Sequence, residues 1–399
     1  MSKNRYQLRC ICCGGEYSPQ EVLYTCPKCG NRRGTLEVVY DFNQETKWLR
    51  EDRKGIKKFI DLLPVEEKFI PDNVIVGDTP LYSSGRLADE YGMSGVLIKD
   101  DGKNPTASFK DRASVIAVAM AKELGYRDIY AASTGNAASS LSGLCAGNDV
   151  KAHIFVPASA PEAKIAQMLI YGAEVFTVAG SYDIAFDLSL KEGEQHGWYC
   201  RNSAVNPYLL EGKKTCALEL AAQTSLELPD YIFVGVGDGT VYSSFIKGFR
   251  DLLALNVIKK IPHVIGVQAE GSAPVKETFE KGDPYEIDDW ERTDTVADSI
   301  AVGKPRDYLK ACRYASEYGG DFVSVSDEAI GSAIMELARK TGVFAEPAAA
   351  ASFAGFKVLA LSGEIPRDST VALIVTGNGL KDVKTPYHFL KEREISINP

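Results

Sequence analysis

The sequence predicts an α/β protein in which parallel sheets are flanked by helices, with a small zinc-ribbon-like module at the N-terminus. Three observations predict this architecture. Buried strands alternate with helix-length segments from Gly95 onward, loops rich in glycine and hydroxyl residues follow directly after strands, and four cysteines form two close pairs near the start. With 399 residues, 45% of them hydrophobic, the chain is long enough for two or three domains.

The N-terminal module is expected over residues 1–40 and is defined by its cysteines. Cys10 and Cys13 form one C-x2-C pair, and Cys26 and Cys29 form a second pair after twelve intervening residues. This spacing is typical of a tetrahedral four-cysteine zinc site rather than of a disulfide framework. Cys12 is a further thiol that could replace Cys13 as a ligand. So short a module has little core of its own, so bound metal would stabilise it.

A nucleic-acid-binding zinc ribbon is the functional alternative for this module. Such a ribbon needs interleaved aromatic and basic residues on one face, and residues 1–40 show no such face. We therefore expect a structural or docking role. The remaining cysteines have small or apolar neighbours and are expected to be buried: Cys145, Cys200, Cys216 and Cys312.

Short apolar runs predict nearly continuous buried strands, as in parallel sheets that are covered on both faces. These runs are residues 96–99, 128–133, 152–157, 174–178, 231–237, 263–268 and 371–377. Between them, apolar residues at helical spacing predict helices over residues 113–124 and 327–340. The second helix is expected to begin with Asp327 as its N-cap.

Two domains are expected after the N-terminal module. Residues 41–120 and 216–399 are assigned to a large domain, and residues 121–215 to a small α/β domain. In parallel sheets, ligands bind at the carboxyl ends of the strands. The loops that carry candidate functional residues all lie at predicted strand ends, so we expect them to meet at one site.

The charge pattern excludes several kinds of partner. The formal net charge is −9 and the chain has no basic block, whereas nucleic acids and anionic membranes bind clustered lysine and arginine. The N-terminus is polar, and no apolar run approaches the roughly 20 residues of a membrane span. A cytoplasmic protein acting on a small molecule is therefore expected.

The segment from Gly235 to Thr240, G-V-G-D-G-T, joins a predicted strand to a predicted helix. Glycines let the backbone approach an anion closely, and the free N–H groups at the helix start supply donors, so this glycine loop is a candidate phosphate cup. It matches neither a Walker loop nor the G-x-G-x-x-G dinucleotide fingerprint. Asp238 would repel a phosphate unless its carboxylate points away to cap the helix or to bind a backbone N–H.

Lys110 lies in P-T-A-S-F-K-D-R, between a turn and an apolar helix. Taken alone, it could be an ordinary surface lysine. Two further loops favour a functional role, S-T-G-N from Ser133 to Asn136 and T-G-N-G-L-K-D from Thr376 to Asp382. A lysine, a phosphate cup, an amide and a hydroxyl are together what pyridoxal phosphate requires: a Schiff-base amine, an anchor, and partners for the ring oxygen and ring nitrogen.

Six motifs, in this order, resemble the fold-type II pyridoxal-phosphate enzymes (the tryptophan synthase beta-like group) and among them the threonine synthase family. They are N-P-T-A-S-F-K-D-R-A, A-S-T-G-N-A, N-S-A-V-N-P-Y-L-L-E-G-K-K-T from residue 202, the G-D-G loop, F-A-E-P-A-A-A-A from residue 344 and V-T-G-N-G-L-K-D. Some family members also carry a cysteine-bearing N-terminal extension. The resemblance implies two doubly wound parallel-sheet domains with the cofactor between them, and a homodimer.

The resemblance also implies roles for the cofactor-binding residues. Lys110 would hold the cofactor and later move protons, with Phe109 beside it. Asn136 would hydrogen-bond the ring oxygen. Thr376 would face the ring nitrogen with a neutral hydroxyl, which favours elimination and replacement over transamination. The phosphate would be bound by the glycine loop, namely Gly235, Val236, Gly237, Asp238, Gly239 and Thr240.

The family reaction converts O-phosphohomoserine and water to threonine and phosphate. It requires one pocket for the substrate carboxylate and another for the substrate phosphate. The resemblance implies a carboxylate pocket formed by Ser133, Thr134 and the backbone at Gly135. Candidates for the second pocket are Asn202, Ser203, Lys103, Arg112 and Lys213.

The chain departs from the family pattern at three positions. Leu209 stands where an arginine is common, Lys213 stands where a glutamine is common, and Ala137 replaces the usual hydroxyl after S-T-G-N. A second function therefore stays open, a β-eliminating or β-replacing enzyme such as a serine/threonine ammonia-lyase or a cysteine-synthase-like enzyme. A non-catalytic zinc-ribbon adaptor is a third interpretation, which the retention of Lys110 speaks against. Glu346 could approach the substrate or serve its helix dipole.

Overall fold

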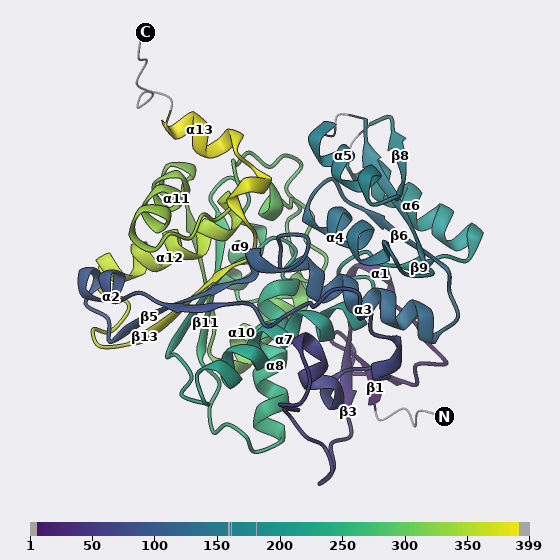
Figure 1. The fold of residues 1–399 in the computed structure, drawn as a ribbon, viewed down its shortest axis with the longest axis horizontal. Helices are drawn as coiled ribbons and strands as arrows, with labels where there is room; N and C mark the ends of the chain where they lie inside the picture. The colour runs from purple at the N-terminus through teal and green to yellow at the C-terminus, as the bar shows by residue number, and fades with distance from the viewer. Residues whose placement is uncertain (1–5, 159, 161, 181, 391–399) are drawn as a thin grey trace.

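The computed structural model describes residues 6–158, 160, 162–180 and 182–390. Within this range it contains three sheets, and the two larger ones consist mainly of parallel strands flanked by helices (Figure 1), so the α/β fold class is confirmed. The N-terminal sheet is antiparallel, with the order β2-β1-β3. Its strands are β1 (Tyr6–Cys10), β2 (Glu16–Tyr17) and β3 (Leu36–Tyr40), and α1 (Gly30–Arg33) precedes β3.

The six-stranded sheet has the order β12-β11-β10-β13-β5-β4, and the edge strand β4 runs antiparallel to β5. The other neighbours are parallel, so their carboxyl ends share one edge of the sheet. Because β10 and β13 are adjacent, the loops that follow them begin side by side. The strands are β4 (Leu81–Ser83), β5 (Gly95–Asp100), β10 (Tyr231–Gly235), β11 (His263–Ala269), β12 (Asp321–Val325) and β13 (Thr370–Val375).

The four-stranded sheet has the order β8-β7-β6-β9 and is parallel throughout. Its strands come from the middle of the chain, so the six-stranded sheet is assembled from segments on both sides of it. In Figure 1 this sheet and the helices around it form the upper right part of the molecule. The strands are β6 (Asp128–Ala132), β7 (Lys151–Pro157), β8 (Glu174–Val178) and β9 (Tyr199–Cys200).

The helices cover both faces of the parallel sheets. The α-helices are α2 (Gly85–Tyr91), α3 (Lys110–Glu123), α4 (Asn136–Cys145), α5 (Glu162–Ile170), α6 (Tyr182–His196), α7 (Tyr208–Gln223), α8 (Thr240–Ala254), α9 (Pro274–Lys281), α10 (Tyr308–Tyr318), α11 (Asp327–Thr341), α12 (Pro347–Ser362) and α13 (Lys384–Leu390). The 3-10 helices are η1 (Gly55–Leu62), η2 (Glu67–Phe69), η3 (Asp101–Lys103), η4 (Asp298–Ile300) and η5 (Gly379–Lys381). No helix of the described ranges is long and apolar enough to cross a membrane.

Helix α7 packs against both α3 and α8 and is buried on almost every side. A helix buried all round is normally apolar, yet α7 carries charged residues in its interior. They are neutralised locally, because Lys214 lies between the carboxylates of Glu211 and Asp251, the latter on α8 at 2.5 Å. The phenol of Tyr40 on β3 donates to Glu211 at 2.7 Å, so the N-terminal module is joined to this buried cluster.

Two features of local structure differ from expectation. The N-cap of α11 is Ser326, whose hydroxyl accepts from Ala329 N at 3.2 Å, and not Asp327. The carboxylate of Asp327 instead accepts from Thr295 Oγ1 at 2.6 Å and from Val296 N at 2.9 Å, contacts across 32 and 31 positions that no local pattern predicts. Helix α3 begins at Lys110 rather than at residue 113, which places this lysine in the first helical turn.

Candidate active site

A cavity of about 350 Å³ opens where the carboxyl ends of the two parallel sheets face each other. Its lining includes the last residue of β7 and residues after β6 and β9 of the four-stranded sheet, and residues after β10 and β13 of the six-stranded sheet. It contains most of the residues expected to be functional. These are Lys110, Ser133, Thr134, Gly135, Asn136, Asn202, Ser203, Gly235, Gly237, Asp238, Gly239, Thr240 and Thr376.

Lys110 reaches the cavity because its loop is tied to the end of β13. Phe109 N donates to the carbonyl of Thr376 at 2.8 Å, and Asn378 N donates to the carbonyl of Ala107 at 3.1 Å. Burial, with the positive charge of Arg201 as the second cause, lowers the pKa of Lys110. A lowered pKa increases the share of neutral amine, which is the form that acts as nucleophile and base.

The glycine loop is shaped by close backbone contacts. Gly239 is the N-cap of α8 with φ of +98°, a left-handed conformation that favours glycine. A Cβ at Gly235 would lie 2.4 Å from the carbonyl oxygen of Ala348, so this position also requires glycine. Thr240 and Val241, the first residues of α8, line the cavity. The first N–H groups of a helix have no partner within the helix, so a helix start at the cavity wall suits an anion.

The carboxylate of Asp238, which complicated the phosphate cup in the sequence, is bound by backbone. Its Oδ1 accepts from Arg306 N at 3.2 Å, and its own carbonyl accepts from Asp307 N at 3.1 Å. The segment before α10 therefore fixes the glycine loop through two hydrogen bonds from its backbone N–H groups to Asp238.

Lys213 lies next to the glycine loop rather than in the lining of the cavity. Its Nζ donates to Thr240 Oγ1 at 2.6 Å. Burial, followed by the positive charges of Lys110 and Arg201, holds the pKa of Lys213 well below its usual range. This lysine was expected at the substrate phosphate, but its contact places it at the first residue of α8.

The loop S-T-G-N turns into α4 at the cavity wall. Ser133 Oγ accepts from Gly135 N at 3.1 Å, and α4 begins at Asn136. Asn136 Nδ2 donates to both carboxylate oxygens of Glu346, each at 2.9 Å. Burial raises the pKa of Glu346, which is the N-cap of α12 and lines the same cavity.

Arg201 is the functional candidate that the sequence interpretation missed. It lines the cavity and is almost fully buried, its Nε donating to Ser114 Oγ at 3.1 Å and its Nη1 to Ser203 Oγ at 3.2 Å. Its neighbour Asn202 accepts from Ala132 N at 2.8 Å, which fixes the loop after β9 against β6. The only signal in the sequence was its position directly before the motif that begins at Asn202.

Besides Lys213, four expected site residues do not line the cavity. Arg112 is fully buried and bound to Asp101 at 2.6 Å and to Glu219 at 3.0 Å, so its charge is already neutralised. Lys103 lies exposed in η3. Phe109 packs against Phe245, with ring centroids 6.3 Å apart, and Val236 is buried in the core. Leu209 is likewise a core residue.

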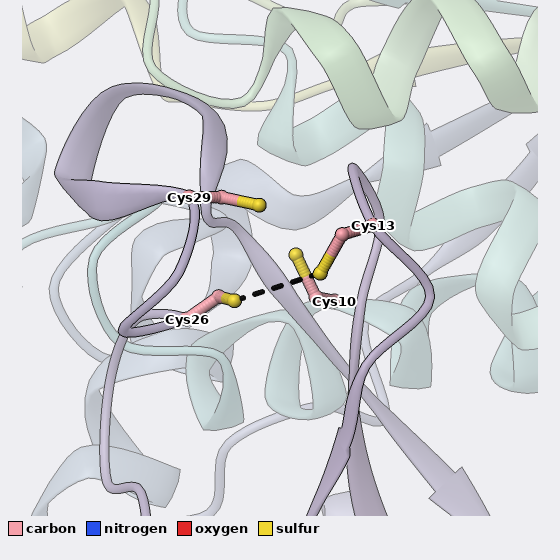
Figure 2. A group of neighbouring side chains, drawn as sticks. All are labelled: Cys10, Cys13, Cys26 and Cys29. Carbon is pink, nitrogen blue, oxygen red and sulfur yellow. Dashed lines mark hydrogen bonds between the residues drawn. The ribbon is translucent and has the colours of Figure 1, made fainter.

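The four cysteines of the N-terminal module converge. The Sγ atoms of Cys10, Cys13, Cys26 and Cys29 all lie within 4.8 Å of one another, and Figure 2 shows them pointing toward a common centre. Cys13 and Cys26 are 3.8 Å apart, close to the edge of about 3.8 Å that a tetrahedron with 2.3 Å metal–sulfur bonds would have. Burial alone would raise the pKa of the Cys26 thiol. Hydrogen bonds from Tyr17 and the backbone outweigh burial and lower this pKa to about 6.

The fold and the cavity together define a pyridoxal-phosphate dependent enzyme, and residues 73–377 match the family described by that name. Solved structures share the fold. Threonine deaminase isoform 2 from Solanum lycopersicum superposes with a TM-score of 0.68 at 23% identity, over 79% of this chain and 82% of that chain. Diaminopropionate ammonia lyase from Escherichia coli gives 0.68 at 17% identity, over 89% and 97%.

Curated relatives narrow this class. Threonine synthase of Methanosarcina acetivorans is 40% identical over 95% of this chain and 93% of its own length. Threonine synthase of Methanocaldococcus jannaschii is 37% identical over 94% and 92%. The chain belongs to the threonine synthase family.

Proposed function

We propose that this protein forms threonine and phosphate from O-phosphohomoserine and water, with pyridoxal phosphate as its cofactor. One observation carries the proposal: a single cavity brings together the amine of Lys110, the start of α8 at Thr240 and the guanidinium of Arg201. A nucleophilic amine, an anion cup and a separate cation suit a phosphorylated amino acid that reacts on this cofactor. Similarity to threonine synthases over nearly the whole chain supports the same function.

The donor set of the cavity fits pyridoxal phosphate. Lys110 supplies the amine, the glycine loop and the start of α8 supply the phosphate site, and Asn136 supplies an amide for the ring oxygen. Lys213 donates a hydrogen bond to Thr240 at the start of α8 and so supports the phosphate site from outside the cavity lining. When bound, the cofactor supplies an electron-withdrawing ring that stabilises negative charge developing on the substrate.

In this proposal Lys110 Nζ moves protons at the substrate. Its lowered pKa suits a base that takes the proton from the α carbon and then assists removal of a β proton, after which the γ phosphate leaves and water adds at the β carbon. Thr376 offers a neutral hydroxyl at the end of β13. A hydroxyl does not hold a proton on a ring nitrogen as a carboxylate does, which favours elimination and replacement over transamination.

The two charged ends of the substrate are assigned to different walls. The N-terminus of α4, with Ser133, Thr134 and Gly135, is assigned to the carboxylate, since helix N-terminal N–H groups bind anions. Arg201 and Ser203, joined by their 3.2 Å hydrogen bond, are assigned to the phosphate. Arg201 thereby compensates for the leucine at position 209. Lys103 and Arg112 receive no role in binding.

Zinc is proposed as the ion of the N-terminal module. Four thiols whose sulfur atoms lie within 4.8 Å suit a closed tetrahedral structural site. Metal analysis of the purified chain is expected to give one zinc per chain, and Cys10→Ser is expected to lose it. A Cys145→Ser control, altering a buried thiol outside the cluster, is expected to retain it.

The domain division, the oligomeric state and the cellular location are also proposals. A large domain of residues 41–120 and 216–399 and a small domain of residues 121–215 are supported by the division of strands between the two parallel sheets. A homodimer and a cytoplasmic location are proposed from the family resemblance. Sedimentation of the purified protein tests the homodimer, and cell fractionation tests the cytoplasmic location.

The deciding experiment compares two reactions of the purified protein. Phosphate release from O-phosphohomoserine is expected, with Lys110→Ala as the inactive control. The competing function is a serine or threonine ammonia-lyase. It is favoured by Leu209, which stands where the threonine synthase family commonly has an arginine. Keto-acid formation from serine, threonine or diaminopropionate, without phosphate release from O-phosphohomoserine, would establish that alternative. An adaptor would show neither reaction and would bind no pyridoxal phosphate.

A further inference from the structure

The four-cysteine module is bound to the wall that carries the glycine loop. Arg32 Nη1, in α1, donates to the carbonyl of Pro305 at 3.0 Å, and Lys310 Nζ, in α10, donates to the carbonyl of Leu36 at 3.0 Å. Arg313 donates to the carbonyl of Ile11, which lies between the first two cysteines. The segment from Pro305 to Arg313 is thus bonded along its length to the module.

Within this interface, Thr35 and Asp307 make a buried hydrogen bond. Thr35 Oγ1 donates to Asp307 Oδ1 at 3.0 Å, with 3% of Thr35 and 0% of Asp307 exposed. Lys310 Nζ lies 3.1 Å from the same oxygen. A carboxylate so deeply buried depends on both partners, because an unsatisfied buried charge is costly.

Asp307 in turn contacts the glycine loop through its backbone. Its N–H donates to the carbonyl of Asp238 at 3.1 Å. A Cβ on Gly239 would lie 2.9 Å from the carbonyl oxygen of Asp307, so the two backbones are in close contact. The position of Asp307 therefore decides where the peptide between Asp238 and Gly239 lies.

Thr35 is held in place by both cysteine pairs. Ile11 N, adjacent to Cys10, donates to the carbonyl of Thr35 at 3.0 Å. On the other side, Cys26 N donates to the carbonyl of Gly34 at 2.9 Å. A metal that ties the two pairs together would therefore fix Thr35 from two directions.

We propose that the metal-bound N-terminal module positions the glycine loop for the cofactor phosphate, and that Thr35 transmits this through Asp307. Thr35 is a positioning residue, since it acts through Asp307 and Asp238 and does not reach the cavity. The proposal rests on the assignment of the glycine loop to the cofactor phosphate, and it gives the cysteine module a purpose beyond its own folding.

The first test measures pyridoxal phosphate affinity of the full chain by absorbance titration. Thr35→Val keeps the shape of the side chain but removes the donor, and is expected to raise the dissociation constant at least roughly fivefold, equivalent to about 1 kcal/mol. Thr35→Ser restores the donor and is expected to stay within about twofold of wild type, well under 1 kcal/mol. Thr25→Val is the matched control, because the exposed Thr25 hydroxyl bonds Asn31 within the module.

A second ligand separates positioning from general loss of stability. Pyridoxal, which lacks the phosphate, is titrated in parallel with each variant. Thr35→Val is expected to weaken pyridoxal phosphate and leave pyridoxal unchanged, since only the phosphate contacts the loop. An unchanged affinity for pyridoxal phosphate, or equal weakening of both ligands, overturns the proposal.

A third arm removes the metal from the wild-type chain with a chelator, at a temperature where circular dichroism shows the chain to remain folded. The same phosphate-specific loss of affinity is expected, and this arm decides the matter if Thr35→Val does not fold. Unchanged affinity after complete removal of metal contradicts the proposal. None of these readouts uses O-phosphohomoserine, so a wrong substrate assignment would be recognised separately, by the phosphate-release assay.

Discussion

The side-chain nitrogen of Asn136 lies 2.9 Å from each carboxylate oxygen of Glu346, and both side chains are buried at the cavity. Asn136 begins α4 beside the four-stranded sheet, whereas Glu346 precedes α12 against the six-stranded sheet. The contact therefore joins the two halves of the molecule across the site. It also orients the amide that is assigned to the ring oxygen of the cofactor.

Glu346 is expected to affect activity by accepting the hydrogen bonds of the Asn136 amide. Glu346→Ala is expected to lower kcat/KM by about 10- to 100-fold, because a buried hydrogen bond to a charged group is lost and the Asn136 amide is left unsatisfied, at a cost of about 1–3 kcal/mol. Glu346→Gln retains one acceptor oxygen and should recover most of the activity. Equal losses in both variants, measured by steady-state phosphate release, would argue for a different role of the carboxylate.

Lys110→Ala is expected to abolish turnover. General acid–base catalysis alone contributes about 10²–10⁴-fold, so a loss of at least roughly a thousandfold is expected. Lys122→Ala, at the far end of the same helix, serves as the control and should retain wild-type activity. Stopped phosphate-release assays on both variants check this, and residual activity above a tenth of wild type in Lys110→Ala contradicts the assignment.

Arg201 should determine preference for a phosphorylated substrate. Arg201→Met is expected to lower kcat/KM for O-phosphohomoserine by about 100-fold, mainly through KM, since charge-assisted bonds from arginine to phosphate are among the stronger ones. Arg86→Met, at an exposed arginine of α2, is the control. Thermal unfolding of both variants shows whether the buried site tolerates the change. If KM for O-phosphohomoserine is unaffected in a folded Arg201→Met protein, the phosphate lies elsewhere.

Gly239→Ala tests the shape of the glycine loop. Both Gly239, with φ of +98°, and Gly125, with φ of +83°, lie in the left-handed region, so alanine costs about 1–2 kcal/mol of stability at either position. A Cβ at Gly239 also meets the carbonyl of Asp307, whereas nothing lies within 4 Å of a Cβ at Gly125. Only Gly239→Ala should weaken pyridoxal phosphate, by about tenfold or 1.4 kcal/mol. Equal affinities in the two variants would contradict the proposed phosphate site.

Glu37 of the N-terminal module forms ion pairs with Arg9 and Arg250, and we expect these contacts to make stability dependent on pH. Burial alone would raise the pKa of the Glu37 carboxyl. The charge of Arg250 and hydrogen bonds from Tyr314 and Arg9 outweigh burial and lower this pKa from 4.5 to about 2. A depressed folded-state pKa stabilises the fold above pH 4.5, and this contribution, about 3 kcal/mol, is lost as the pH falls toward 2.

Glu37→Gln should therefore lower the unfolding temperature at neutral pH and flatten its decline in acid. Glu16→Gln, at an exposed residue of the same module, should leave both unchanged. Thermal unfolding of the three proteins followed at a series of pH values checks this. A decline as steep in Glu37→Gln as in wild type would show that acid sensitivity originates elsewhere.

The sequence by itself determined the elements and the chemistry of the loops. Continuous apolar runs predict β10 and β13, and the residues that extend those runs, Val236 and Thr376, lie in the loops that follow. The glycine loop predicts the passage from strand to helix, and α8 begins at Thr240, while the spacing of the cysteines predicts their cluster. These features depend on neighbours within a few residues, which is why a linear pattern reveals them.

Only the tertiary structure decided which polar and charged side chains pair. Arg201 reaches Ser114 across 87 positions, Asn136 reaches Glu346 across 210, and Thr35 reaches Asp307 across 272. Arg112, which a sequence reading places at the substrate, is instead neutralised in the core by Asp101. These pairings depend on the order of strands in each sheet and on the burial around each charge. The local pattern of residues predicts neither of these, because both arise from contacts between distant segments.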